Sequence, residues 1–263
     1  MRHRVGALQC LRILMCVGAG RYFGLQGLPF AIPIAQKRLP KDTAWEDDVV
    51  LFLDCDDCLY QNNWTTAEKL TDSIAAYTAR LGVSKEEAFA LYEEHGTALK
   101  GLLAEGILDE NGAEVYLQDV HAIDLSDITP DPQLARLVGR LRKRPWIFTA
   151  STEEHVRRCI RRLKLSSKDL AGIIDTRLCR LETKHHPSSF NVAMQRAGVA
   201  RPEHCLLCDD SLKNIRAAKR MGWRAVLVGY LSRGDGSPVQ CEEADFHIGS
   251  IHELPEVMPE LWN

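Results

Sequence analysis

The chain has 263 residues, 26% of them charged and 45% hydrophobic, and a formal net charge of −3. This length allows a sizeable buried core, in one domain with an insertion or in two domains. The nearly balanced charge provides no broad basic field for a nucleic acid polymer, so a small-molecule partner fits better. Nine cysteines, an odd number scattered through predicted strands and helices, indicate reduced thiols and therefore a reducing compartment.

Residues 1–45 form a basic leader, because the arginines and lysines in this segment precede the first acid, Asp42. Arg12 interrupts the apolar stretch 7–19, which is too short and too charged for a membrane span. An organellar transit peptide, a secretory signal and an untargeted disordered extension all remain open. We therefore expect a mitochondrial, plastid or cytoplasmic location, with no membrane span in the chain.

Residues 49–53 are five consecutive apolar residues, which predicts a strand buried on both faces, as in a parallel sheet. Asp54, Asp56 and Asp57 follow directly, at the end where open α/β sheets bind ligands. In extended backbone, Asp54 and Asp56 would share a face while Asp57 points away. Two like charges this close require a nearby cation or a proton on one of them.

Further apolar runs lie at 146–148, 173–174, 205–208 and 225–228, with helical patterns between most of them. This alternation predicts an α/β fold with a Rossmann-like parallel sheet. We assign 46–60 and 128–258 to this core.

Strand signals disappear between residues 61 and 127, where helical patterns replace them. We assign this range to an inserted helical domain that covers the site. Ser84 and Glu87 have the spacing of a capping box, which predicts a helix starting at Lys85. Trp64 and Tyr92 are candidates for stacking on a nucleobase, although packing inside the helical insert is an alternative.

A second acidic pair, Asp209 and Asp210, ends the apolar run 205–208. Grouped carboxylates without a convincing histidine and cysteine set favour Mg²⁺, although each pair taken alone is also typical of a helix cap. Thr149 follows the run 146–148, just before a helix predicted to begin near Glu153, and could donate to a phosphate or act as a turn residue. Lys184 precedes another helical pattern and could neutralise a dianion or simply be solvated.

This order of motifs resembles the haloacid dehalogenase superfamily of phosphatases, over about residues 48–256. A closer resemblance is to its pyrimidine 5′-nucleotidase-like branch. Four stretches carry it: Asp54-Cys55-Asp56-Asp57-Cys58-Leu59-Tyr60, the insert segment 92–102, Ile147-Phe148-Thr149-Ala150, and 209–215. The resemblance implies a helical cap of the C1 type inserted after the first strand.

The resemblance also implies roles for individual residues. Asp54 would attack phosphorus, and Asp56 would protonate the leaving oxygen and then activate water, for which we expect a raised pKa. Mg²⁺ would be bound by the Asp54 carboxylate, the Asp56 backbone carbonyl and Asp210, with Asp209 contacting it directly or through water. Thr149, Ala150 and Lys184 would bind substrate, and Ala150 stands where this branch commonly has asparagine. Ser211 and Asn214 are expected just behind the metal ligands.

We therefore expect a Mg²⁺-dependent phosphomonoester hydrolase that forms an aspartyl-phosphate and acts on a small phosphorylated metabolite, a pyrimidine nucleoside 5′-monophosphate. The alternatives are a phosphatase of sugar phosphates or other small phosphoesters, and a binding protein that retains the fold without turnover. The sequence leaves open whether the protein forms a homo-oligomer. A carbon–chlorine hydrolase fits less well, because Asp56 and the second acidic pair would be superfluous to it.

Two further patterns carry weaker hypotheses. The two C-x-x-C spacings, 55–58 and 205–208, do not predict a zinc site, since on an extended strand positions three apart face opposite sides. If the strands that end at residues 53 and 208 are neighbours, Cys55 and Cys208 could approach each other and be oxidised, or be structural thiols. The arginines of 157–162 are interpreted as a solvated helix face.

Overall fold

The computed structural model describes residues 48–262, which all belong to one compact unit. The predicted leader, 1–45, lies outside the described residues.

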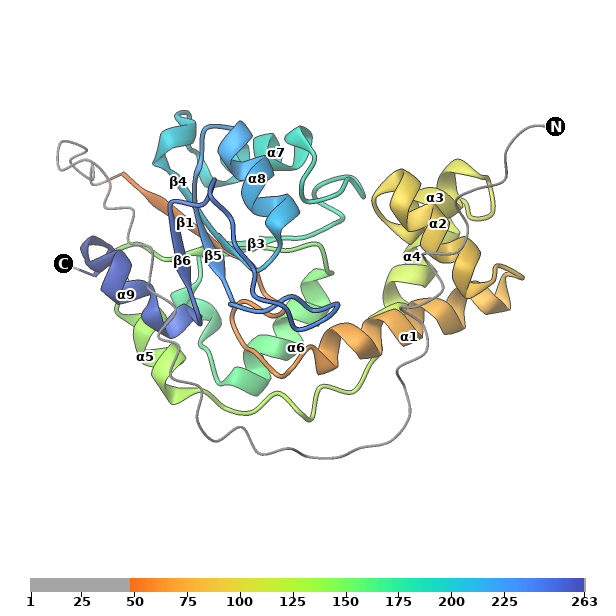
Figure 1. Cartoon of the computed structure of the whole chain (residues 1–263), viewed down its shortest axis with the longest axis horizontal. Helices are drawn as coiled ribbons and strands as arrows, with labels where there is room; N and C mark the ends of the chain where they lie inside the picture. Colours follow the sequence, from red (N-terminus) through yellow and green to blue (C-terminus); the bar gives the residue numbers. More distant parts are fainter. Residues whose placement is uncertain (1–47, 263) are drawn as a thin grey trace. The chain divides into compact units, whose positions relative to one another are not determined.

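The core is a six-stranded, fully parallel sheet with the strand order β3-β2-β1-β4-β5-β6, which confirms the predicted α/β class (Figure 1). Five of the strands match the predicted apolar runs, and the sixth, at one edge, was not predicted. The strands are β1 (Val50–Leu53), β2 (Trp146–Phe148), β3 (Gly172–Ile174), β4 (Cys205–Asp209), β5 (Arg224–Val228) and β6 (Phe246–Ile248).

Helices cover both faces of the sheet, as long parallel connections require. On one face, Leu51 and Leu53 pack with α5 (Pro132–Gly139), α6 (Glu153–Leu163) and α9 (Leu254–Val257). On the other face, Phe52 packs with α7 (Pro187–Ala197), α8 (Leu212–Arg220) and the buried Trp223. Because β1 is central and buried on both sides, the acids that follow it have a rigid support.

Four helices follow β1 before the chain returns to the core at α5, which confirms the helical insert (Figure 1). They are α1 (Thr65–Arg80), α2 (Lys85–His95), α3 (Ala98–Ala104) and α4 (Glu110–Val120). The predicted capping box is present at the start of α2, where Ser84 and Glu87 bond reciprocally. These helices share their own buried cluster, centred on Tyr77, Leu102 and Tyr116. The insert, called the cap below, therefore has a hydrophobic core separate from that of the sheet.

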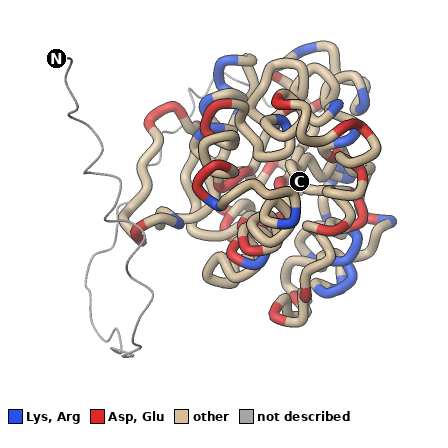
Figure 2. Tube along the Cα trace, turned by 90° about the vertical axis from the view of Figure 1, so that its right-hand side faces the viewer, with Lys and Arg blue, Asp and Glu red and all other residues tan. Residues whose placement is uncertain are grey.

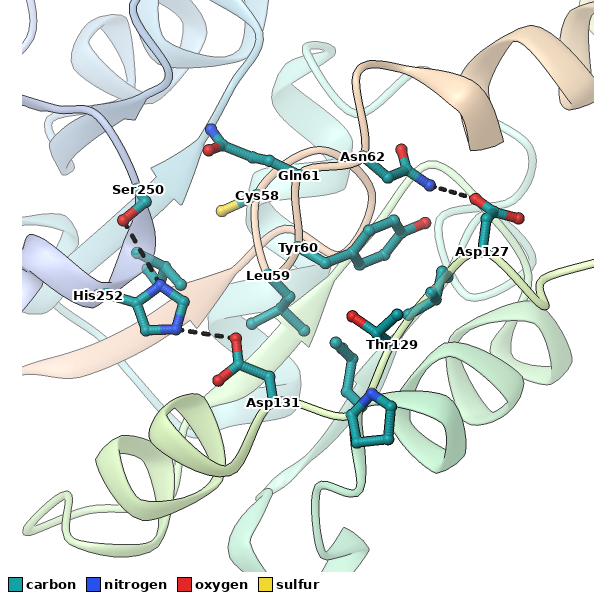
Figure 3. A pocket seen from close by; sticks show the side chains of 14 residues that line it. Cys58, Leu59, Tyr60, Gln61, Asn62, Asp127, Thr129, Asp131, Ser250 and His252 are labelled. Atoms are coloured by element: carbon teal, nitrogen blue, oxygen red, sulfur yellow. Dashed lines mark hydrogen bonds and ion pairs between the residues drawn. The ribbon is translucent and has the colours of Figure 1, made fainter.

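The two segments that join the cap to the core lie side by side (Figure 3). Asn62, on the outgoing segment, donates to Asp127 on the returning one at 2.5 Å. A cavity of about 230 Å³ lies against both segments, and its lining includes His252, whose Nε2 lies 2.9 Å from Asp131.

The arginine face of α6 is solvated as predicted, since Arg157, Arg161 and Arg162 are exposed and Arg158 is half-buried. Two of these arginines also bind the chain that returns from the cap. Arg158 donates to the carbonyls of His121 and Ile123, and Arg162 donates to those of Ser126 and Ile128. These carbonyls belong to the loop between α4 and α5 and make no hydrogen bonds within a helix or a sheet. The guanidinium groups donate to them instead. The basic face of α6 therefore anchors the returning segment.

Acidic and basic residues are interspersed along the described chain (Figure 2). This distribution agrees with the small net charge and with the absence of a broad basic field in the sequence. Within residues 48–262, no helix combines the length and apolar character needed to cross a membrane.

Candidate active site

The predicted site residues converge at the carboxyl edge of the sheet, because β1, β2 and β4 are adjacent and parallel. Asp54 follows β1, and its backbone N–H donates to the carbonyl of Cys208, which extends the ladder by one residue. Asp209 is the last residue of β4, and Thr149 follows β2. The sheet therefore gathers groups that are about a hundred residues apart in sequence.

Lys184 lies between two of these carboxylates. Its ammonium is 2.6 Å from Asp54 Oδ1 and 2.5 Å from Asp209 Oδ2, and only 2% of its side chain is exposed. Burial alone would lower the pKa of Lys184, but the charges of Asp209 and Asp54 outweigh burial and raise it. Lys184 is therefore a buried cation that touches the predicted nucleophile.

Asp54, Asp209 and Asp210 each offer a carboxylate oxygen within 4.8 Å of the others, a suitable arrangement for a divalent cation. Burial raises the pKa of Asp54 to about 8, with Lys184 opposing the shift and Asp209 adding to it. Burial, and then the charges of Asp209 and Asp54, also raise the pKa of Asp210 well above its ordinary value. One lysine thus does not balance three acids, and a hard divalent cation fits the remaining charge.

Both carboxylate oxygens of Asp209 accept hydrogen bonds from neighbouring residues. Its Oδ1 accepts from the backbone N–H of Ser211 at 2.8 Å, and both oxygens accept from Asn214 at 3.0 and 3.2 Å. Asp209 is completely buried, whereas Asp210 is partly exposed. Asp209 therefore holds Lys184 in place, which leaves Asp210 as the freer ligand.

The backbone around Asp56 differs from the extended form assumed from the sequence. The strand ends at Leu53 and a turn begins at Asp56, closed by a bond from the N–H of Leu59 to the carbonyl of Cys55. Asp57 adopts φ of 57° in this turn, a conformation favoured by Asp and Asn among non-glycine residues. The turn, and not strand alternation, therefore sets the direction of each acid.

Three donors surround the Asp56 carboxylate. Tyr60 donates to Oδ1 at 2.5 Å, His155 Nε2 lies 2.8 Å from the same oxygen, and Ser151 donates to Oδ2 at 2.9 Å. The His155 side chain is fully buried and that of Asp56 is 17% exposed. These contacts therefore hold the Asp56 carboxylate in one orientation, and part of it remains exposed.

The expectation of a raised Asp56 pKa is wrong. Burial raises the pKa, but the hydrogen bond and charge of His155, followed by the hydrogen bonds from Tyr60 and Ser151, outweigh burial and lower it. Burial lowers the pKa of His155, yet its contacts with Asp56 and Cys159 raise that pKa to about 10. At neutral pH the two residues form an imidazolium–carboxylate pair.

Behind this pair lie two buried thiols. Cys159 Sγ is 3.5 Å from His155 Nε2 and 3.9 Å from the Tyr60 hydroxyl. A hydrogen bond from Cys55 lowers the pKa of Cys159 to about 6. Cys55 contacts Cys159, and the Cys58 thiol donates to the Cys208 carbonyl at 3.4 Å. The suggested approach of Cys55 to Cys208 stays a prediction.

Thr149 and Ala150 occupy the rim between the acids and the cap. Thr149 is buried and its hydroxyl accepts from the N–H of Ser151 at 3.0 Å, so its observed contact is that of a turn residue. The helix cap itself is Thr152, and α6 begins at Glu153 as predicted. Ala150 is exposed and borders a cavity that extends into the cap.

This cavity has a volume of about 580 Å³. Most of its lining is apolar and comes from the cap, and its floor at the core includes Ser151, which also bonds Asp56. Tyr92 and Phe89 line it, but Trp64, the other aromatic candidate, is not among the lining residues. The cavity therefore ends one side chain away from the predicted acid/base.

Sequence reasoning missed His155, Tyr60 and Ser151. A signal was present for His155, because it precedes Cys159 by one turn on the apolar stripe of α6 and so continues the buried face. This helix starts at the carboxyl edge of the sheet, where the acids lie. A histidine on its buried face needs a polar partner, and the acids are the nearest candidates.

Comparisons with known proteins agree with this architecture. Phosphate metabolism protein 8 of Saccharomyces cerevisiae is 26% identical over 200 residues, covering 68% of this chain and 60% of that protein, so the chain spans less than two thirds of this relative. The structure of CbbY from Rhodobacter sphaeroides in complex with phosphate is similar with a TM-score of 0.55 and 19% identity, covering 78% of this chain and 95% of that one.

The structure of β-phosphoglucomutase from Clostridium difficile is similar with a TM-score of 0.53 and 17% identity, covering 81% of this chain and 96% of that one. At these identities the two structures support the fold alone. Residues 49–222 match the family model for haloacid dehalogenase-like hydrolases, about two thirds of the chain. The chain belongs to the haloacid dehalogenase-like hydrolases.

Proposed function

We propose that the protein is a Mg²⁺-dependent phosphomonoester hydrolase in which Asp54 forms an aspartyl-phosphate. The observation that carries the proposal is the pairing of the buried Lys184 ammonium with Asp54 at 2.6 Å, beside two further carboxylates. A phosphomonoester dianion needs positive charge around it, and its nucleophile needs to be held unprotonated.

Asp54 attacks phosphorus and displaces the leaving oxygen. The pKa of Asp54 is about 8 even with Lys184 beside it, so without a metal ion the carboxyl would be substantially protonated at neutral pH. A Mg²⁺ ion bound by Asp54, Asp210 and the Asp56 carbonyl would supply charge neutralisation for the phosphoryl oxygens. Lys184 contributes a fixed positive charge next to the same carboxylate.

Asp56 protonates the leaving oxygen and later takes a proton from water. Because the Asp56 pKa is lowered, the carboxylate alone would carry little proton at neutral pH. The neighbouring His155 holds a proton within 2.8 Å, so the pair has one to deliver through Asp56. His155 is thus a positioning residue and a proton reserve for Asp56.

The cap cavity supports a leaving group with a flat ring, and we propose a pyrimidine nucleoside 5′-monophosphate. Its walls combine aliphatic residues with Phe89, Tyr92 and Tyr116, and polar groups such as Thr176 and Arg233 also line it. A ring can pack on the aromatic and aliphatic walls, while the polar groups can bind the ribose hydroxyls and the polar edge of the base.

The test is phosphate release from a panel of nucleoside monophosphates, sugar phosphates and an aryl phosphate, with Mg²⁺ and with chelator. We expect Mg²⁺-dependent release, highest for pyrimidine nucleotides, and none from Asp54→Asn. Equal rates for sugar phosphates would reject the substrate but keep the reaction class. Folded wild-type protein that releases no phosphate from any compound would favour a binding protein.

A further inference from the structure

A second cluster of metal-ligating side chains lies directly behind Asp56. Cys55, Asp56 and Cys159 each offer one ligand atom, and these atoms all lie within 4.8 Å of one another. The His155 ring lies beside this group, with its Nε2 2.8 Å from Asp56 Oδ1 and 3.5 Å from Cys159 Sγ, but it is not one of the three grouped donors. The cluster thus contains two sulfurs and one oxygen.

Three donors are enough for zinc, because sites with three protein ligands leave a fourth position for another ligand. With Zn–O bonds near 2.0 Å and Zn–S bonds near 2.3 Å, neighbouring donors lie about 3.3 to 3.8 Å apart. The three donor atoms already lie within 4.8 Å of one another, so each pair would have to approach by at most about 1.5 Å.

The donor chemistry separates this cluster from the neighbouring acids. Asp54, Asp209 and Asp210 offer only hard oxygens, which suit Mg²⁺. Thiolate donors instead select zinc and other soft or borderline ions. Two adjacent sites therefore share the segment that follows β1, one that prefers hard ions and one that prefers soft or borderline ions.

Burial favours a tight site with one entrance. Cys55 and Cys159 are completely buried, and the His155 side chain is 0% exposed. The Asp56 side chain, 17% exposed, is the most open of the three donors, so an ion would enter past Asp56.

We propose that Cys55, Asp56 and Cys159 form an inhibitory site for Zn²⁺, distinct from the acidic site for Mg²⁺. Bound zinc would hold the Asp56 carboxylate and remove it from acid/base work. The binding proposal stands on the donor cluster alone, and the inhibition rests on the proposed phosphatase function. Binding releases protons from the thiols, so affinity should rise with pH.

The experiment titrates the full-length protein with Cd²⁺ as the probe, in saturating Mg²⁺ and a non-thiol reductant. The thiolate-to-cadmium absorption in the ultraviolet reports binding without any assay of activity. We expect one ion per chain and no displacement by additional Mg²⁺. Cys159→Ser should weaken binding at least about tenfold, since even residues behind a metal ligand are worth that much.

Cys205→Ser is the matched control, because Cys205 is equally buried but belongs to the cluster on the opposite face of the sheet. It should bind Cd²⁺ like the wild type. Circular dichroism checks the fold of each variant, and Cys55→Ala provides a second test if Cys159→Ser does not fold. Wild-type affinity in a folded Cys159→Ser or Cys55→Ala variant, or displacement of Cd²⁺ by Mg²⁺, would overturn the site.

Activity then tests the consequence separately. Zn²⁺ should inhibit the wild type and Cys205→Ser at saturating Mg²⁺, with at least tenfold less effect on Cys159→Ser. Inhibition relieved by excess Mg²⁺ would instead assign zinc to the acidic site and contradict the proposal. If the wild type hydrolyses no phosphomonoester, the absorption titration still decides whether the site exists.

Discussion

Lys184 and Asp56 show how this site handles buried charge at the level of single residues. Lys184 stays charged because two carboxylates contact it, and Asp56 stays ionised because His155, Tyr60 and Ser151 contact it. The acids themselves could be located from the sequence, since each follows an apolar strand. Their partners could not, because the contact between residues 56 and 155 depends on how a helix packs, which no local pattern records.

The His155–Asp56 pair makes a specific prediction about stability. The raised pKa of His155, about 10, means that its contribution is complete below the unfolded value near 6.5 and is lost as pH rises through about 10. Relative to His155→Gln, the wild type should lose up to about 1.4 kcal/mol of unfolding free energy per pH unit in that window. Urea unfolding from pH 6 to about 10.5 measures the difference.

Tyr60→Phe is the control for this series. It removes another hydrogen bond to the same carboxylate. Burial raises the pKa of Tyr60 above its ordinary value near 10, so the phenol stays protonated in both the folded and the unfolded protein up to about pH 9. Its destabilisation should therefore stay constant from pH 6 to about 9. A constant difference for His155→Gln as well would contradict the ion pair.

At the level of elements, the strands with uninterrupted apolar runs and the helices with a local start signal were predictable, and the elements without such a signal were not. The capping box of α2 and the start of α6 were confirmed because both have local signals. The strand β6 was missed, since Phe246-His247-Ile248 is only three residues with a polar centre. The positions of α3 and α4 were likewise not predicted, and α3 has only seven residues.

Two glycines of the cap helices should respond in opposite ways to alanine. A Cβ at Gly101, in α3, would lie 2.5 Å from Leu91 Cβ in α2, so the helices would have to move apart. A Cβ at Gly112, in α4, would meet the end of the Leu108 side chain at 2.9 Å and Asp109 Oδ1 at 3.3 Å, both on side chains that can shift. Gly101→Ala should therefore cost about 1 to 2 kcal/mol despite its better helix propensity.

Gly112→Ala serves as the comparison, and should be neutral or stabilising by up to about 1 kcal/mol. Thermal or urea unfolding of both variants measures the effect. Gly101→Ala as stable as Gly112→Ala would mean that α2 and α3 do not pack this closely.

At the level of the whole molecule, strand–helix alternation predicted the parallel sheet and the missing strands predicted the insert. Neither pattern encodes how the cap contacts the core, which depends on side chains from distant segments. Arg177, after β3, donates to both oxygens of Glu114 on α4 at 2.8 and 2.9 Å and to Glu154 on α6 at 2.7 Å. Lys100 on α3 pairs with Glu182 of the core at 2.7 Å.

Loss of the Arg177 contacts should loosen the cap without unfolding the core. Arg177→Met removes pairs of a kind worth up to about 1 kcal/mol each, so KM should rise about two- to fivefold with a smaller change in kcat. Arg177→Lys should not restore KM, because a single ammonium cannot reproduce the two-pronged contact. Steady-state kinetics measure both.

Arg80→Met is the matched control, because Arg80 pairs with Asp119 at 2.7 Å inside the cap. It should leave KM unchanged. A similar rise in KM for both variants would show that the cap–core pairs have no special role.

The central claim is that Asp54 becomes phosphorylated during turnover. The most direct measurement is acid quenching of the protein during turnover of a substrate found in the phosphate-release panel, followed by peptide mass spectrometry. We predict a base-labile phosphoryl group on Asp54 in the wild type and none in folded Asp54→Asn. A folded wild-type protein that turns over with no phosphoryl group on Asp54, or an Asp54→Asn variant with full activity, would contradict this account.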